Sequence, residues 1–463
     1  MEKGYKPELI EAGNWDKESS LTLDDYIFKS SHKVPPHVRL VGGQSTKWFG
    51  RMSLFPKSAY VNRTGIIGHE WPLPYSEIEK GYLEVCRILE LDVQSDEKSL
   101  IHECEICIGL VDKVFYDFLD NPNIFQSILK ELLQRNQVSL SPSTYCSNLL
   151  GVADGVLVTT ISTKPGLSKV NTEFYDDVFI CCGTLDSTRL VLSSFPELRR
   201  ETSAGKFLMD HLDGYVGKIK IRPSDYKCIK EFYLNSSRRL PNQIFGLGVC
   251  KATKDINWHL EIVPLVRVYL FDPVVKRFNR LPRLFYEALF FLERLITFIP
   301  NRVSRLVCKL RKIEVFSLWL RAEEFPFDES KLELGNVNRV SNIPTVIYKH
   351  RVSTYSLKTI QNTLRYFANS MKMGNLGIIK IYWWLLFPGF FNLGGNNHPM
   401  GTLSTGTTGR FPVNQDLQLR VAPKVRVVSS AVFPSGGHQN PTSLAMSLAI
   451  LSTKAFPEML NSE

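Results

Sequence analysis

The sequence of 463 residues has few features of a membrane or secreted protein. It contains no uninterrupted apolar stretch of the roughly 20 residues that a helix needs to cross a bilayer. Its first residues lack the basic and apolar stretches of a secretion signal. Its nine cysteines are scattered and odd in number, which does not favour a disulfide framework. These absences predict a cytoplasmic location.

The sequence also has little that indicates a metal site or a nucleic-acid partner. Cys104 and Cys107 form a single CxxC pair near His102, and without a second pair they are weak evidence for zinc or redox chemistry. No nucleic-acid-binding motif accompanies the basic charge. A hydrophobic content of 44% and a charged content of 22% are ordinary for a globular protein, and the length suffices for two domains. We therefore expect neither a metal nor a nucleic acid.

Positive charge is concentrated in one part of the chain, whose formal net charge is +10. Between residues 276 and 312, ten Lys or Arg stand against two acidic residues, interleaved with the largely apolar stretch 285–299. Basic residues beside an apolar helix suit an anionic membrane surface, here the inner face. The favoured alternative is a helix with a solvated basic face and a buried apolar one.

The residues that could carry chemistry gather near the C-terminal end. The Gly-rich stretch GGNNHPMGTLSTG (394–406) contains one imidazole, His398. Further on, Asn440, Pro441 and Thr442 have the character of a helix start. A helix N-terminus exposes unpaired N–H groups and can hold an electron-rich ring or an oxyanion. An imidazole and a carboxamide brought there would form a proton acceptor and an orienting donor for an alcohol.

The beginning of the chain is typical of one strand of a dinucleotide-binding unit. GYKPELIEAG (4–13) has the pattern of the second strand, and Glu11 at its end is placed to bind a ribose hydroxyl. In such a unit this acid follows a G-x-G-x-x-G turn by about 20 residues. Only ten residues precede Glu11, and no such turn follows a predicted strand elsewhere. We therefore expect a chain that lacks the first strand and the phosphate-binding glycines.

Three C-terminal stretches together resemble a known family. HPMGT (398–402), SSAVFP (429–434) and NPT (440–442) are similar, in order and spacing, to the C-terminal block of the FAD-dependent glucose–methanol–choline (GMC) oxidoreductases. RLVGGQSTKWFGRM (39–52) and GKFLMDH (205–211) resemble further segments of that family. The likeness covers most of the chain and is weakest between about residues 214 and 320.

The resemblance implies roles for individual residues. His398 would be the catalytic base and Asn440 its partner in the second active-site position. Ser429 stands where the family usually has Asp, so one polar contact to the flavin would be shortened or lost. The residues implied to contact FAD are Glu11, Gly42, Gly43, Ser45, Trp48, Gly183, Ser429, Ser430, Pro441 and Thr442.

The fold implied is α/β. An FAD-binding dinucleotide fold with a mainly parallel sheet would comprise residues 1–212 and 395–463, and residues 213–394 would form an inserted α+β substrate-binding domain. The implied activity is oxidation of an alcohol CH–OH group, with hydride transfer to the flavin. A sugar-like alcohol is the first expectation for the substrate, and a lipid-linked or sterol-like alcohol the second. The alternative is a non-catalytic remnant or a fragment of such an enzyme.

Overall fold

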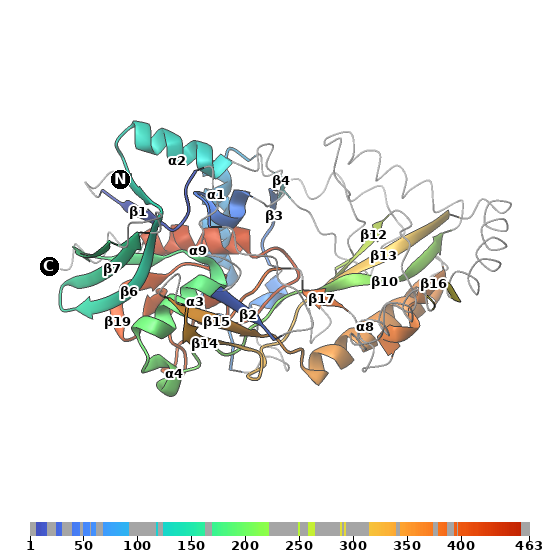
Figure 1. Ribbon diagram of the computed structural model, residues 1–463. Helices are drawn as coiled ribbons and strands as arrows, with labels where there is room; N and C mark the ends of the chain where they lie inside the picture. Colours follow the sequence, from blue (N-terminus) through green and yellow to red (C-terminus); the bar gives the residue numbers. More distant parts are fainter. Residues whose placement is uncertain are drawn as a thin grey trace.

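The computed structural model of the chain forms two bodies joined side by side (Figure 1). The larger body contains several small sheets packed with helices, and the smaller one contains a single antiparallel sheet with one long helix on it. The residues that the structure describes are 6–15, 25–29, 39–46, 50–55, 57–61, 68–91, 117–118, 124–162, 169–221, 249–250, 258–263, 288, 291–292, 314–338, 343–373, 378–386, 393–395 and 397–454.

Parallel pairing occurs in three small sheets of the larger body. Their strands are β1 (Glu8–Glu11) beside β5 (Ser139–Pro142), β9 (Val178–Ile180) beside β19 (Ala422–Val427), and β2 (Tyr26–Phe28) beside β15 (Pro344–Lys349). The antiparallel strands of this body are β14 (Lys331–Val337), β18 (Gln418–Leu419), the meander β6 (Thr144–Val152), β7 (Gly155–Ser162) and β8 (Val170–Tyr175), and the pair β3 (Arg51–Met52) and β4 (Asp117–Phe118).

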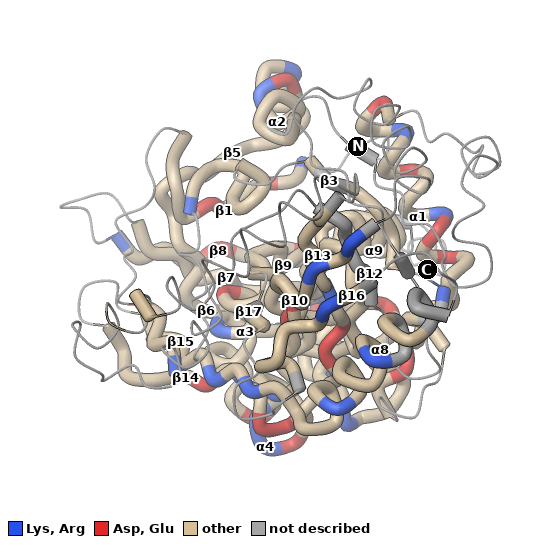
Figure 2. The backbone as a smooth tube through the Cα atoms, turned by 90° about the vertical axis from the view of Figure 1, so that its right-hand side faces the viewer, with Lys and Arg blue, Asp and Glu red and all other residues tan. Residues whose placement is uncertain are grey.

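The smaller body is built on a six-stranded antiparallel sheet. Its order is β11-β12-β13-β10-β16, with β17 also pairing with β10. These strands are β10 (Leu212–Ile221), β11 (Val249–Cys250), β12 (Trp258–Val263), β13 (Glu314–Ala322), β16 (Ile378–Ile381) and β17 (Gly394–Gly395). In Figure 2 basic residues lie along the strands of this sheet. The predicted domain limits at 212 and 395 stay predictions, although β10 begins and β17 ends at these positions.

The helices bury the apolar positions that recur along them. In α1 (Tyr75–Ile88), Ile78, Tyr82 and Val85 are buried, the spacing of one helix face. The small-residue helix α9 (Thr442–Lys454) packs closely on α1. The other helices are α2 (Ile124–Gln134), α3 (Gly183–Ser194), α4 (Leu198–Glu201), α8 (Thr354–Met373), and the 3₁₀ turns η2 (Gly43–Thr46), η3 (Lys57–Ala59), η6 (Trp383–Leu386) and η8 (Ser430–Val432).

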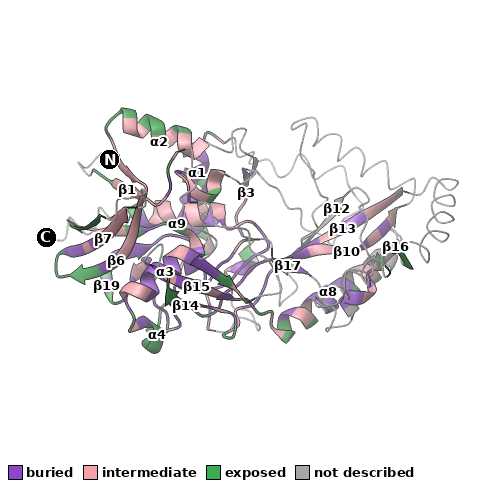
Figure 3. Ribbon diagram, viewed as in Figure 1, coloured by how far each residue is buried: buried purple, intermediate pink, exposed green. Residues whose placement is uncertain are grey.

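Each body has its own hydrophobic core, shown in purple in Figure 3. The larger core lies between α3, α9, β9 and β19 and includes Val191, Val427 and Leu448. The smaller core lies between α8 and the six-stranded sheet, where Leu364 packs with Leu318. Because burial of apolar surface is the main stabilising contribution, each body can hold its own part of the chain in place.

The mixed α/β character predicted from the sequence is confirmed, but a single, mainly parallel sheet is not observed. Among the described strands, β1 pairs only with β5, and β9 pairs only with β19, at the edge of a three-stranded sheet. The parallel strands therefore form separate ladders, because no described strand hydrogen-bonds to the remaining edge of β1 or of β9. The dinucleotide-binding fold as a whole stays a prediction.

Several features singled out in the sequence lie outside the described residues. They are Trp48, the pair Cys104 and Cys107, and nearly all of 276–312, of which only residues 288, 291 and 292 are described. In the part of the chain that the structure describes, no helix combines the length and the apolar character needed to span a membrane.

Candidate active site

His398 is held in place by its main chain. The segment 397–402 runs antiparallel to 207–211, and Met209 and Met400 exchange two backbone hydrogen bonds of 3.0 and 2.9 Å. Gly401 has φ +93°, and a Cβ there would lie 2.5 Å from the Phe207 carbonyl oxygen. Only glycine therefore allows this close approach. The backbone N–H of His398 donates to Asp210 Oδ1 at 3.1 Å, which fixes the residue from the side of the neighbouring strand.

The His398 ring faces a second imidazole. Its Nδ1 lies 3.3 Å from Nδ1 of His211, and the ring centroids are 5.2 Å apart at an interplanar angle of 68°. Nδ1 of His398 is therefore engaged with His211, and its Nε2 is the nitrogen left to meet a substrate. If Nδ1 carries the proton and donates to His211, then Nε2 is a proton acceptor.

Asn440 stands at the start of α9, and an arginine fixes its carboxamide. Arg321 Nη1 donates to Asn440 Oδ1 at 3.0 Å. Since the amide oxygen accepts from the guanidinium, the amide NH₂ is directed to the other side, where it can donate. Arg321 lies in β13 opposite Asp213 of β10, and its Nε is 3.5 Å from Asp213 Oδ2.

Burial and positive charge keep both imidazoles neutral at physiological pH. Burial, followed by the charge of Arg321, lowers the pKa of His398 to about 3. Burial also lowers the pKa of His211 well below its usual value, with further contributions from His398, Arg321 and His438. A neutral imidazole can accept a proton, whereas an imidazolium cannot.

Two buried acids lie behind the histidine pair. Burial raises the pKa of Asp210 to about 6, while the charge of His350 and the N–H donors of His211 and His398 act in the opposite direction. The backbone N–H of Asp210 donates to Glu324 Oε2 at 2.9 Å, and the same oxygen lies 2.7 Å from Nε2 of His350. Asp210, which accepts the His398 backbone N–H, is thus linked to the buried pair of Glu324 and His350.

The start of α3 and the turn η8 are tied to the His398 loop. The hydroxyls of Thr184 and Ser430 lie 2.8 Å apart, and both donate to the Pro399 carbonyl, at 2.6 and 3.0 Å. Ser429 caps η8, because its Oγ accepts from the Ala431 N–H at 3.3 Å. The network brings Ser429, Ser430 and the start of α3 close to the residue next to His398.

Glu11 lies near the same helix start. Its carboxylate accepts from the Gly13 N–H at 2.7 Å. Burial raises the pKa of Glu11, and the charge of Asp186 in the first turn of α3 adds to this, while the Gly13 N–H and the charge of Arg39 act in the opposite direction. Glu11 also helps to raise the pKa of Cys182, which precedes α3. The end of β1 and the beginning of α3 therefore lie close enough for their charges to interact.

The turn at Gly42 and Gly43 lies beside the end of β1. The Val41 N–H donates to the Asn14 carbonyl at 3.1 Å, and both glycines have positive φ, +97° and +53°. Ser45, expected from the sequence as a cofactor donor, gives its hydroxyl to the Gly42 carbonyl at 2.6 Å and so stabilises the turn itself.

Pro441 and Thr442 form the first part of α9. Pro441 is buried, and its carbonyl accepts the first helical hydrogen bond, from the Ala445 N–H at 3.0 Å. A proline suits this position because a residue entering a helix needs no N–H partner. The helix start is anchored to the rest of the body by Ser443, whose hydroxyl accepts from the Ser53 N–H at 3.0 Å.

The residues present fit a flavin nucleotide. A Cβ added at Gly43 or at Gly183 would meet no atom within 4 Å, so the main chain is open at both positions. Gly183 has φ +66° and begins α3, whose N–H groups and dipole favour a phosphate or another electron-rich group. Glu11 adds a carboxylate for a ribose, and the hydroxyl network at Ser430 lies toward His398. The described residues hold no group of three or more metal-ligating side chains.

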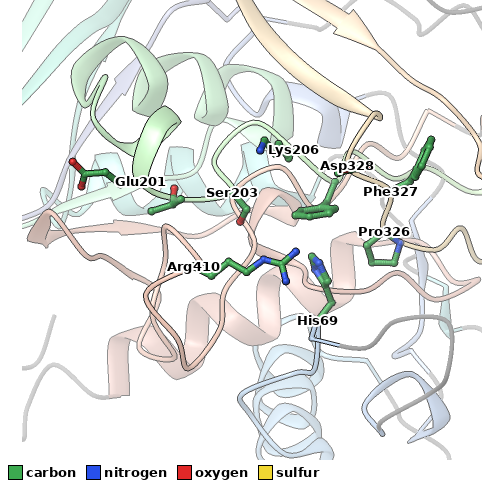
Figure 4. A pocket seen from close by; sticks show the side chains of 10 residues that line it. His69, Glu201, Ser203, Lys206, Pro326, Phe327, Asp328 and Arg410 are labelled. Atoms are coloured by element: carbon green, nitrogen blue, oxygen red, sulfur yellow. The ribbon is translucent and has the colours of Figure 1, made fainter.

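A separate pocket of about 500 Å³ lies on the surface of the larger body, and none of the residues nominated above lines it. Figure 4 shows Arg410 and His69 pointing toward one another in it. Burial, followed by the charge of Arg410, lowers the pKa of His69 to about 4.

Arg321 and His211 were not predicted as site residues from the sequence, although His211 belongs to a stretch, GKFLMDH, that resembles the family. Arg321 is the one charged residue in the largely apolar stretch VFSLWLRA (315–322), and His211 ends GKFLMDH beside Asp210. A buried charge in an apolar strand is an available signal, because such a charge is seldom fully buried without a partner. The partner itself could not be found in this way, since Arg321 and Asn440 are 119 residues apart.

Comparison with known proteins bears on the same part of the chain. Residues 391–449 match the family model described as GMC oxidoreductase. A search of curated proteins finds none that matches the chain. The matched span holds both His398 and Asn440, together with the η8 turn and the start of α9. Residues 391–449 are therefore similar to the C-terminal domain of the GMC oxidoreductases, and this match supports membership of that family.

Proposed function

We propose that the chain is a flavin-dependent enzyme that oxidises an alcohol, with His398 as the proton acceptor and Asn440 as the group that orients the hydroxyl. One observation supports this most directly. Arg321 hydrogen-bonds the Asn440 carboxamide, and its charge also acts on the neutral His398 imidazole, so one arginine is linked to both groups although they lie on different segments. These two groups are what removal of a hydroxyl proton requires.

The flavin, when bound, supplies the acceptor for the hydride. Glu11 would hold its ribose, the start of α3 at Gly183 would face its phosphates, and Ser429, Ser430 and Thr442 would lie along its ring end. FAD is the form expected, because a dinucleotide has both the ribose for Glu11 and the phosphates for α3.

The protein's own groups carry the proton. The Asn440 amide NH₂ donates to the alcohol oxygen and holds the hydroxyl toward His398. Nε2 of His398 accepts the hydroxyl proton as the O–H bond breaks, and the electron pair stays on the oxygen. As the C–H bond breaks, this pair forms the carbonyl double bond, so the alcohol loses one proton and one hydride in total. The Nδ1 contact with His211 keeps the ring turned for this transfer.

The class of alcohol that the enzyme oxidises is proposed from the family resemblance. A sugar-like alcohol stands first and a lipid-linked or sterol-like alcohol second, both from the family resemblance.

The test is anaerobic reduction of the bound flavin. Purified protein with its flavin would be mixed with single alcohols from three groups, namely sugars, simple primary alcohols and sterols, while the flavin absorbance is recorded. Bleaching by at least one alcohol is the expected result, and it does not depend on which electron acceptor the enzyme uses. A flavin that chemical reductants bleach but no alcohol does would favour the non-catalytic alternative.

A further inference from the structure

We propose that Arg321 is a positioning residue, which orients the Asn440 carboxamide and places a positive charge beside His398 and the reacting oxygen. The inference rests on the proposed function for the identity of that oxygen. The placement of Arg321 itself depends only on contacts within the protein.

Arg321 is a charged residue at a buried position. It lies near the end of β13 between Leu320 and Ala322, which are both fully buried, and is itself only 8% exposed. Burying a guanidinium is unfavourable unless its N–H groups and its charge are matched. Asn440 Oδ1 accepts a hydrogen bond from Nη1 at 3.0 Å, and Asp213 supplies the opposite charge, its Oδ2 lying 3.5 Å from Nε.

The contact with Asn440 settles which way the carboxamide is turned. If the amide were rotated by half a turn, its NH₂ group would face the guanidinium, and two sets of donors would oppose each other. Arg321 therefore keeps Oδ1 on its own side and leaves the NH₂ group for the substrate. An amide without this contact could adopt both orientations, only one of which donates to an alcohol oxygen.

The charge of Arg321 acts on His398 as well. The charged or titratable groups around that imidazole are Asp210 at its backbone, His211 at Nδ1, Arg321, and His438 beyond His211. Among the described residues, Arg321 is the cation whose charge contributes to the lowered pKa of His398. It disfavours the imidazolium, so the His398 imidazole is unprotonated in the resting site. It also favours negative charge on the oxygen that loses the proton.

The direct test is a histidine NMR titration of the flavin-bound protein. His398 would be followed by its ring ¹⁵N signals in the wild type, in Arg321→Met and in Arg321→Lys, with assignment from His398→Gln. We expect His398 to titrate at higher pH in Arg321→Met than in the wild type, because the cation is gone. Arg321→Lys retains the charge and should leave the titration near that of the wild type.

Steady-state kinetics separate charge from orientation. Arg321→Met should lower kcat/KM by about 10- to 150-fold, the range expected for loss of a hydrogen bond to a charged group. Arg321→Lys should show a smaller decrease in kcat/KM, mainly through a higher KM, because an ammonium does not reproduce the planar guanidinium that holds the amide. The matched control is Arg351→Met, which removes an exposed arginine that pairs with Glu329 on the surface of the described part of the chain.

The outcomes are distinguishable. An unchanged His398 titration together with a kcat/KM within twofold of the wild type in Arg321→Met would overturn the inference. A shifted titration in a protein that oxidises no alcohol would support the placement of Arg321 and count against the proposed function alone. If Arg321→Met does not fold, Arg321→Lys replaces it in the test. A lower kcat/KM in Arg321→Lys with a normal melting temperature would support the inference, and an unchanged kcat/KM would overturn it.

Discussion

His398 is the residue whose replacement should affect turnover most. His398→Ala should reduce kcat by about 10²–10⁴, as expected for loss of a general base, while the flavin stays bound. Asn440→Ala should reduce kcat less and raise KM, because orientation is lost along with a hydrogen bond. The measurements are steady-state kinetics and the flavin absorbance spectrum of each variant. Wild-type turnover in His398→Ala would remove this residue from the mechanism.

His69 should make the fold sensitive to acid. Its pKa is about 4 in the folded chain and about 6.5 when unfolded, so the unfolded chain takes up a proton at a higher pH. Neutral His69 therefore makes its full contribution to the free energy of unfolding above pH 6.5, and this contribution is lost as the pH falls toward 4. At or below pH 4 this loss amounts to about 3 kcal/mol.

His69→Phe tests this sign, because the ring packs edge-on against Phe207 and Phe411 and a phenyl group can replace it. Urea midpoints would be compared at pH 8 and pH 5. Between pH 8 and pH 5 the urea midpoint of the wild type should fall more than that of His69→Phe. An identical difference at both pH values would show that His69 titrates normally in the folded chain.

At the scale of elements, the contact between α1 and α9 positions Asn440. A Cβ at Gly81 of α1 would lie 2.7 Å from the Ser447 carbonyl of α9, so Gly81→Ala must push the helices apart. Alanine is the better helix former by about 1 kcal/mol, but the clash should outweigh this and give a net loss of stability of about 1–3 kcal/mol.

Because Asn440 precedes the first turn of α9, Gly81→Ala should also lower kcat/KM. Thermal melting and kinetics would be compared with Leu83→Ala, which changes an exposed residue on the same helix. Equal stability and activity in the two variants would mean that α9 shifts without consequence for the site.

The elements also show what the sequence could and could not predict. The helix start at Asn440 is a local pattern, and α9 begins at Thr442, beside the position predicted. His211 could not be paired with His398 from the sequence, because 187 residues separate them and only the antiparallel contact between their segments brings them together. Likewise, the role of Ser45 depends on a carbonyl three residues away that the turn happens to present.

At the scale of the whole molecule, the site draws on both cores. The residues expected to hold the flavin lie on elements of the larger core, namely β1, α3, η8 and α9, whereas Arg321 and Asp213 come from the sheet of the smaller core. Damage to each core should therefore have a different functional effect, even where the loss of stability is similar.

Two substitutions of the same kind test this division. Leu448 in the larger core and Leu364 in the smaller one are almost fully buried, at 0% and 3% exposure, so each Leu→Ala change should cost about 2–5 kcal/mol. Leu448→Ala should weaken flavin binding, because α9 carries Thr442 at its first turn. Leu364→Ala should retain flavin but lower kcat/KM, because the sheet that carries Arg321 loses its support. Flavin occupancy from absorbance, read at a temperature below both melting midpoints, separates the two. Equal loss of flavin in both variants would contradict the division and show that the two bodies unfold as one cooperative unit.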